Sequence, residues 1–145
     1  MKDKYIVYFI SKTRKKMIKF IEKQLQEKEL EGLIPSHGNI LTALYENGGK
    51  LTMKEIAKII GKDKSTVTPL VNKLLELGYI RKEKCEKDRR ITFIGLTSKG
   101  REIELKFKSI SNEVLKTAYS GFTVEEKEIF LRLLKRLYNN FKLDN

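Results

Sequence analysis

Residues 53–74 read MKEIAKIIGKDKSTVTPLVNKL and have the spacing of a helix-turn-helix. In this motif the first helix needs a small residue where the second helix crosses it, and four positions later the turn needs a residue that tolerates positive φ. Ala57 and Gly61 meet these requirements, while Val67 and Leu70 place apolar side chains on the inner face of the second helix. The spacing predicts two packed helices, although two amphipathic helices with a merely solvated outer face would also satisfy it.

The outer face of the second helix carries short polar side chains near its start, which suit contacts with base edges and phosphates. The residues of this helix that we expect to contact DNA are Lys64, Ser65, Thr66, Thr68, Pro69 and Lys73. Pro69 removes one backbone donor and crowds the carbonyl four residues earlier. With Ser65 as the N-cap, this proline would lie at the edge of the first turn, so we expect a late or kinked helix start. Its ring would face outward, against a thymine methyl or a sugar.

Residues 79–97 follow directly and hold two strand-like apolar stretches around a cluster of cations. The first predicted strand bears Tyr79 and Ile80, and the second bears Ile91, Phe93 and Leu96. The connector carries the cations Lys82, Lys84, Lys87, Arg89 and Arg90. A β-hairpin with such a tip can reach DNA phosphates or a narrow minor groove. The formal net charge of +12 favours a polyanionic partner without distinguishing DNA from RNA or an acidic membrane.

Further helices are predicted before the motif. Apolar residues at helical spacing predict a first helix over residues 5–31, which Gly32 would end. Ser36 is a candidate N-cap of a second helix, and the pair Gly48-Gly49 would end that helix. A third, short helix is expected from about residue 52.

After the hairpin, Thr97 can cap a helix that runs to about residue 119. Thr123 with Glu126 forms a capping box that opens the last helix, and a wide apolar stripe follows. The stripe consists of Ile129, Phe130, Leu133, Leu134, Leu137, Tyr138 and Phe141. Such a stripe needs a surface that covers it. A second copy of the chain is the commonest solution, and folding back onto the same subunit is the alternative.

The chain resembles the MarR family of winged helix-turn-helix transcription regulators over essentially its whole length. The most specific signal is the wing pattern of Asp, any residue, Arg, five residues and Leu-Thr, which is met by Asp88, Arg90, Leu96 and Thr97. The stretch LLELGYIRKE at residues 74–83 is similar to that family's exit from the recognition helix. The resemblance implies that Arg90 enters the minor groove and that Asp88 orients it by a charge-assisted hydrogen bond. From the residues alone, the same turn could hold only a solvated ion pair.

The resemblance also implies a mostly α-helical fold with a small β-wing, in a single MarR-type domain over residues 1–145. Residues 36–98 would form the winged helix-turn-helix, and residues 1–34 and 99–145 would interlock with a second subunit. The resulting homodimer would present two recognition helices to adjacent major grooves and bind a pseudo-palindromic operator. Many MarR-like proteins release DNA when a small molecule binds, but no motif here identifies an effector or its pocket.

We therefore predict a cytoplasmic, sequence-specific regulator of double-stranded DNA, in a family whose members are more often repressors than activators. The predicted division of contacts is Ser65, Thr66, Thr68 and Lys73 at the major groove, Arg90 at the minor groove, and Lys64, Lys84, Lys87 and Arg89 on phosphates. One alternative is an architectural DNA- or RNA-binding protein of low specificity, which the high lysine content would suit. Another is a winged helix used as a protein-interaction module.

The sequence offers little support for other chemistry. His37 is the sole histidine and lies at a predicted helix start, where capping or surface exposure is expected rather than catalysis. We assign no catalytic residue, no metal ligand and no cofactor. The apolar run YIVYFI at residues 5–10 is too short to span a bilayer, because cations follow it closely, so no membrane partner is expected.

Cys85 is the sole cysteine, so no internal disulfide can form, in keeping with a reducing compartment. It lies among Lys82, Lys84, Lys87 and Arg89, surroundings that favour a thiolate and its oxidation. Cys85 is therefore a candidate redox site, and an incidental surface cysteine is the plainer interpretation.

Overall fold

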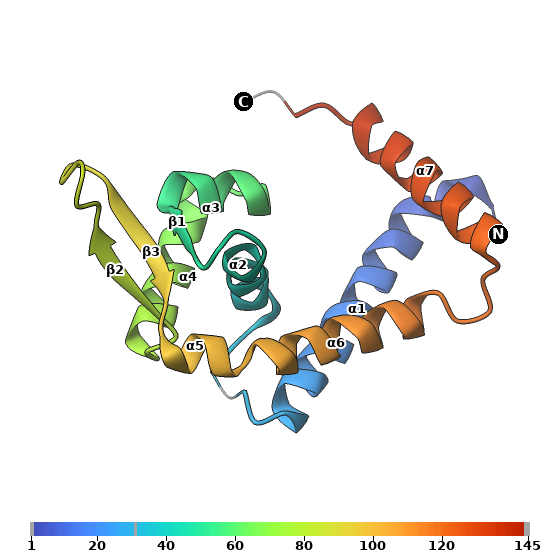
Figure 1. Cartoon of the computed structure of the whole chain (residues 1–145). Helices are drawn as coiled ribbons and strands as arrows, with labels where there is room; N and C mark the ends of the chain where they lie inside the picture. The colour runs from blue at the N-terminus through green and yellow to red at the C-terminus, as the bar shows by residue number, and fades with distance from the viewer. Residues whose placement is uncertain (1, 31, 144–145) are drawn as a thin grey trace. The chain divides into compact units, whose positions relative to one another are not determined.

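The computed structural model describes residues 2–30 and 32–143 (Figure 1). It confirms the predicted fold class, which is mostly helical with one small β-sheet. The elements in chain order are the 3-10 helix η1 (Asp3–Tyr5), α1 (Ile6–Glu27), α2 (Pro35–Glu46), β1 (Lys50–Thr52), α3 (Met53–Ile60), α4 (Lys64–Glu76), β2 (Ile80–Lys84), β3 (Thr92–Leu96), α5 (Ser98–Glu102), α6 (Glu104–Ala118) and α7 (Val124–Asn140). The chain forms two compact units, Met1–Ser111 and Asn112–Asn145.

The sheet has the strand order β1-β3-β2 and is antiparallel throughout. Leu51 of β1 pairs with Ile94 of β3, and Ile80 of β2 pairs with Leu96 of β3. Because residues two apart on a strand share a face, these four apolar side chains lie together on one side of the sheet, where all four are buried. The hairpin was predicted, but β1 was not, since three residues are too few to show a strand pattern.

Helices α2, α3 and α4 pack together beside this sheet (Figure 1). Their inward side chains are fully buried, with at most 2% of the surface exposed; they are Ile40, Leu41, Ala43, Leu44, Ile56, Val67, Val71 and Leu74. Gly61 ends α3 with a φ of 68°, which is the left-handed turn conformation that the helix-turn-helix spacing predicted. The helix-turn-helix is therefore present, and its apolar face forms the core of the winged-helix part.

The boundaries of the first two helices differ from those predicted. Helix α1 ends at Glu27 rather than near residue 31, because Glu29 takes a left-handed φ of 59° and turns the chain out of the helix. Helix α2 begins at Pro35, so Ser36 is not its N-cap. Proline suits the first helical position, where its missing N–H would have had no partner within the helix. The N–H of Ile34 instead donates to Nδ1 of His37 at 3.0 Å.

Thr97 joins the end of α4 to the start of α5. Its hydroxyl oxygen accepts from the N–H of Gly100 at 3.1 Å, which confirms the predicted cap. The same hydroxyl donates to the carbonyl of Gly78 at 2.6 Å, and Nζ of Lys99 donates to the carbonyl of Leu77 at 2.6 Å. Two side chains at the start of α5 thus hold the carbonyls that follow α4.

The helix predicted from Thr97 to about residue 119 is divided in two. Helix α5 ends at Glu102, and α6 begins at Glu104, with buried Ile103 between them. Gly100 lies so close to the carbonyl of Tyr79 that any side chain there would collide with it. This contact fixes α5 against the start of the hairpin, and α6 continues after a turn. The apolar spacing runs through the break, so periodicity alone does not reveal it.

The second unit contains α7, whose capping box is confirmed. The N–H of Glu126 donates to the hydroxyl of Thr123 at 3.1 Å, and the N–H of Thr123 donates to the carboxylate of Glu126 at 3.1 Å. Phe122 packs edge-on against Tyr119 and Phe130, with ring centroids 5.7 Å apart in each pair. These contacts fix the turn that leads into α7.

Candidate nucleic-acid interface

Helix α4 begins with a strong N-cap. The N-cap is Asp63, not Ser65 as predicted. The carboxylate of Asp63 accepts from the N–H of Thr66 at 2.8 Å and from the hydroxyl of Ser65 at 2.8 Å. Hydrogen bonds from Thr66 and then Ser65 lower the pKa of the Asp63 carboxyl, so the group is ionised at neutral pH. A negative charge at this end also complements the helix dipole.

Pro69 lies inside α4 and is exposed. The predicted late start is wrong, because the helix begins at Lys64. Capping by Asp63 places Ser65 in the first turn, so Pro69 falls in the second turn and denies the Ser65 carbonyl its helical donor. The helix nevertheless runs to Glu76, and the proline ring stands on the outer face, as predicted.

The predicted DNA contacts of α4 fall on the face opposite the core. Four of them are exposed and two are half-buried, respectively Lys64, Ser65, Thr66 and Pro69, and Thr68 and Lys73. Val67, Val71 and Leu74 occupy the opposite face and are completely buried. The structure therefore brings all six predicted residues onto one polar surface, with the core behind it.

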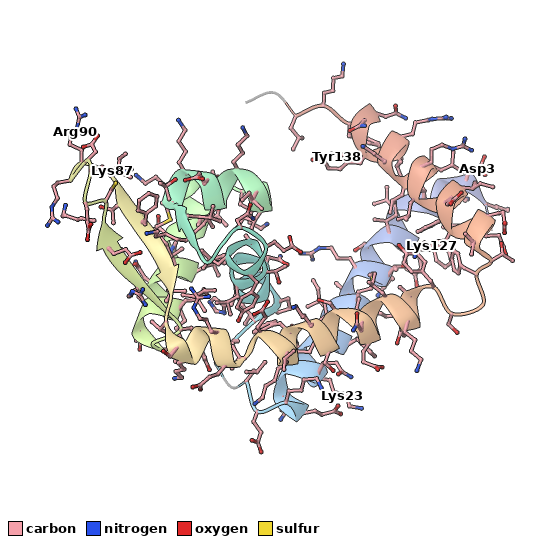
Figure 2. All side chains as sticks on the ribbon, viewed as in Figure 1. Asp3, Lys23, Lys87, Arg90, Lys127 and Tyr138 are labelled. Carbon is pink, nitrogen blue, oxygen red and sulfur yellow. The ribbon has the colours of Figure 1, made fainter. Side chains whose placement is uncertain are left out.

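The tip of the hairpin holds Arg90 in one orientation. One carboxylate oxygen of Asp88 accepts from the backbone N–H of Arg90 at 3.1 Å and from its Nε at 3.0 Å. The other oxygen accepts from Nη2 at 3.0 Å. These hydrogen bonds lower the pKa of Asp88 and raise that of Arg90. The Arg90 side chain is 91% exposed and extends from the tip of the hairpin (Figure 2).

This pair has the geometry that the resemblance implied for the wing. An exposed ion pair adds little to stability, since water screens it and two side chains lose freedom. Its bidentate form does fix direction, because the planar guanidinium matches the two carboxylate oxygens. The arrangement of Asp88 and Arg90 therefore makes an oriented, accessible cation rather than a stabilising bridge.

The remaining predicted cations lie on the same hairpin. Lys84, Lys87 and Arg89 are all exposed, and Lys87 is visible beside Arg90 at the tip (Figure 2). Nζ of Lys84 makes a long contact of 3.4 Å with the carbonyl of Arg89. Exposed cations of this kind attract DNA phosphates without reading sequence.

Cys85 lies where β2 enters the tip. Its backbone N–H donates to the carbonyl of Ile91 at 2.9 Å, which closes the hairpin. Its thiol is free and half-buried. Ile91 itself precedes β3, so the second strand starts one residue later than predicted. A redox role for Cys85 stays a prediction.

Several surface groups beside α4 were not among the predicted contacts. Lys54 and Lys58 are exposed one turn apart on α3, and Lys62 is exposed in the turn before α4. The first helix of a helix-turn-helix commonly crosses the DNA backbone, and the spacing of four residues was the available signal. Asn72 is exposed one turn after Thr68 and adds an amide to the outer face of α4.

His37 is a structural residue. It is only 5% exposed, and its Nδ1 accepts a hydrogen bond at the start of α2, so the predicted capping role is confirmed and surface exposure is wrong. Burial, and then the charge of Lys73, lower its pKa. Among the described residues, no three His, Cys, Asp or Glu side chains gather into a group that could hold a metal ion. No described helix has both the length and the apolar character needed to cross a membrane.

Sequence relatives agree with this geometry. The sequence profile of the MarR family matches residues 31–91. YybA of Bacillus subtilis, an uncharacterized HTH-type transcriptional regulator, is 32% identical over 104 residues, which cover 72% of this chain and 69% of YybA. The HTH-type transcriptional regulator SarZ of Staphylococcus aureus is 30% identical over 126 residues, which cover 87% of this chain and 80% of SarZ.

Solved structures share the fold. A MarR transcriptional regulator from Methanosarcina mazei matches with a TM-score of 0.76 at 26% identity, over 95% of this chain and 97% of that one. A mutant MarR from E. coli, complexed with operator DNA, matches with a TM-score of 0.78 at 17% identity, over 91% and 92% of the two chains. The organohalide-sensing regulator RdhR, in its 2,4-dichlorophenol bound form, matches with a TM-score of 0.80 at 23% identity, over 97% and 82%. This chain therefore belongs to the MarR family of winged helix-turn-helix regulators, which bind DNA, control transcription and are not enzymes.

Proposed function

We propose that this chain binds a pseudo-palindromic operator as a homodimer and represses transcription there. Helix α4 enters the major groove, and the hairpin tip reaches the adjacent minor groove. Residues 36–98 form the DNA-binding part, and residues 1–34 and 99–145 form the dimerisation helices. The observation that carries this proposal is the exposed guanidinium of Arg90, which Asp88 holds at the tip of the hairpin that follows α4.

The Asp88–Arg90 geometry suits a groove contact more than a phosphate contact. A phosphate attracts any nearby cation, so Lys87 would serve there without orientation. A narrow minor groove instead attracts a cationic side chain that is inserted into it, so the side chain must point into the groove. The carboxylate engages Nε and Nη2, which directs the remaining guanidinium nitrogen, Nη1, away from the pair. Holding the side chain before binding also reduces the entropy lost on association.

The apolar stripe of α7 supports a homodimer. This 17-residue helix lies wholly in the described part of the chain, and none of its residues is buried. Ile129, Phe130, Leu133 and Leu134 each remain more than 40% exposed. A single helix of this length is marginal in water unless packing stabilises it. The same stripe on a second copy would cover it, and the pair would present two α4 helices to DNA.

The start of α1 offers a second apolar surface to the same dimer. Tyr5, Ile6, Tyr8, Phe9 and Ile10 are each between 44% and 56% exposed. An aromatic group of this size on a free surface is a common mark of an interface. Release of DNA by a small molecule completes the proposal, and the RdhR neighbour, solved with 2,4-dichlorophenol, supports that part.

Selection of genomic fragments at physiological salt, followed by sequencing and gel-shift titration, tests the proposed operator. A shared palindromic sequence is expected. Fragments without a common sequence would favour the low-specificity alternative. Failure of duplex DNA to compete for the protein would favour the protein-interaction module.

Arg90→Ala tests the wing on the selected operator. The variant should weaken binding by about 1–3 kcal/mol if the guanidinium contacts a groove. Arg132→Ala is the matched control, because Arg132 is an exposed arginine outside the apolar stripe of α7 and its loss changes the net charge equally. Equal affinities for Arg90→Ala, Arg132→Ala and the unmodified protein would remove Arg90 from the interface.

A further inference from the structure

Hydroxyl groups on the outer face of α4 already donate hydrogen bonds to acceptors within the protein. The hydroxyl of Ser65 donates to the Asp63 carboxylate at 2.8 Å, and the hydroxyl of Thr68 donates to the carbonyl of Lys64 at 2.7 Å. Ser65 and Thr68 therefore offer bases few hydrogen-bond donors.

The outer face of α4 instead presents apolar groups to a base. A threonine that bonds back to the carbonyl four residues earlier has a fixed rotamer, and this also fixes its methyl group. Pro69 is the next residue and presents an exposed, rigid ring. Thr68 and Pro69 together form a small apolar surface in the middle of the outer face. In the major groove the apolar group available to such a surface is the C5-methyl of thymine.

Two further features of this face favour the same base pair. Helix α4 contains no arginine, which is the side chain that most often reads guanine in the major groove. Asn72 is exposed one helical turn beyond Thr68. Its amide has the donor and acceptor pattern that matches the N6 and N7 edge of adenine.

From this chemistry we propose that α4 reads A·T base pairs, with thymine methyl groups packed against Pro69 and Thr68 and an adenine edge facing Asn72. The inference rests on the proposed placement of α4 in the major groove. Specificity would then come mainly from shape and methyl contacts on α4, while Arg90 reads groove width beside it.

Deoxyuridine in place of thymine tests the methyl contact, because it removes only the C5-methyl. Each thymine of the selected operator is replaced in turn, and affinity is measured by fluorescence anisotropy. At one or two positions in each half-site the affinity should fall about fourfold, as expected when one buried carbon is lost. Thymines in the flanking DNA should tolerate the same change.

Two protein variants assign the effect to α4. Pro69→Ala removes the ring and restores a backbone donor for the Ser65 carbonyl, so the helix should remain intact. It should bind thymine and uracil operators equally at the position that the ring contacts. Arg90→Ala is the control, because it should weaken both operators by the same factor and keep the fourfold difference.

The outcomes separate the two proposals. If the protein binds no sequence more tightly than a scrambled duplex, the proposed function fails. If it binds an operator specifically but tolerates uracil at every thymine, the A·T inference alone is overturned. It is overturned equally if Pro69→Ala and the unmodified protein keep the same preference for thymine.

Discussion

Asp88 and Arg90 act together at the tip of the hairpin. The carboxylate of Asp88 accepts hydrogen bonds from the guanidinium and the backbone N–H of Arg90, and the guanidinium remains exposed. A carboxylate close to DNA also repels phosphates. The two effects of Asp88 on binding therefore have opposite signs, which makes them separable by experiment.

Asp88→Ala should reduce the difference between the free energies of operator binding and non-specific binding by about 0.5–1.5 kcal/mol. This is the cost of ordering one long side chain on binding. Affinity for scrambled DNA should rise or stay constant, because a negative charge is lost. Titrations with operator and scrambled duplexes measure both quantities. Glu86→Ala is the matched control, since Glu86 is an exposed carboxylate in the same turn. An equal ratio in the two variants would mean that Asp88 does not position Arg90.

His37 makes stability depend on pH. Its pKa lies below the ordinary value of 6.5, first because of burial and then because of Lys73. The unfolded chain therefore takes up a proton near that value, whereas the native chain does so only at lower pH. Since the unfolded state binds more protons in this window, the free energy of unfolding should fall as the pH drops below about 6.5.

Urea unfolding at about pH 7.5 and about pH 5.5 measures this effect. His37→Gln keeps a side-chain acceptor near the N–H of Ile34 and removes the titrating ring. The free energy of unfolding of this variant should change less between the two pH values. The same pH dependence in both proteins would show that another group is responsible.

At the scale of elements, features that depend on local spacing were predicted from the sequence. Gly61, Thr97 and the capping box at Thr123 have the roles expected of them. The start of α4 was missed because Asp63 and Ser65 are both good N-caps two residues apart. The break at Ile103 was missed because it depends on packing between segments distant in the sequence.

In the candidate site, too, the features set by local spacing were predicted and those set by the folded structure were not. The cations of the hairpin and the outer residues of α4 were predicted, since turn position and helical phase follow from spacing. The hydrogen bonds that commit the hydroxyls of Ser65 and Thr68 were not, because they depend on where α4 begins. Asn72 was expected on the outward face of this helix, although it was not assigned a contact, and Lys58 was passed over, although helical spacing makes its position available.

The cap of α4 should contribute measurably to stability. Asp63→Ala removes the acceptor for the N–H of Thr66 and should lower the free energy of unfolding by about 1 kcal/mol. Asp63→Asn keeps an acceptor and should retain most of that stability. Thermal unfolding followed by circular dichroism compares the variants. Equal midpoints for all three proteins would contradict the cap that the structure describes.

At the scale of the whole molecule, the cations proposed to contact DNA and the apolar stripe of α7 lie on different elements. The exposed cations of the hairpin and α3 suit a polyanion, and the stripe of α7 suits a second protein surface. If that surface is another copy of the chain, affinity for a palindromic operator depends on both the cations and the stripe. Loss of the dimer would weaken operator binding without altering any residue that touches DNA.

Leu133→Glu should therefore shift the protein to monomers, since a carboxylate buried without a partner in an apolar interface costs about 2 kcal/mol or more. Light scattering during size-exclusion chromatography measures the mass, and gel shift measures the weaker operator binding. Lys135→Glu changes an exposed polar residue of the same helix and should leave the dimer intact. A dimer that survives Leu133→Glu would place the interface elsewhere.

Thr97 and Lys99 couple the orientation of α4 to that of α5. Helix α4 has 13 residues and is about 20 Å long at 1.5 Å per residue. Its C-terminal end is tied to α5 through the carbonyls of Leu77 and Gly78. A tilt of about 10° about that tie would move the opposite end by about 3 Å, the length of one hydrogen bond. In the proposed complex with DNA, a small turn of α5 would therefore be enough to take the start of α4 out of register with the bases.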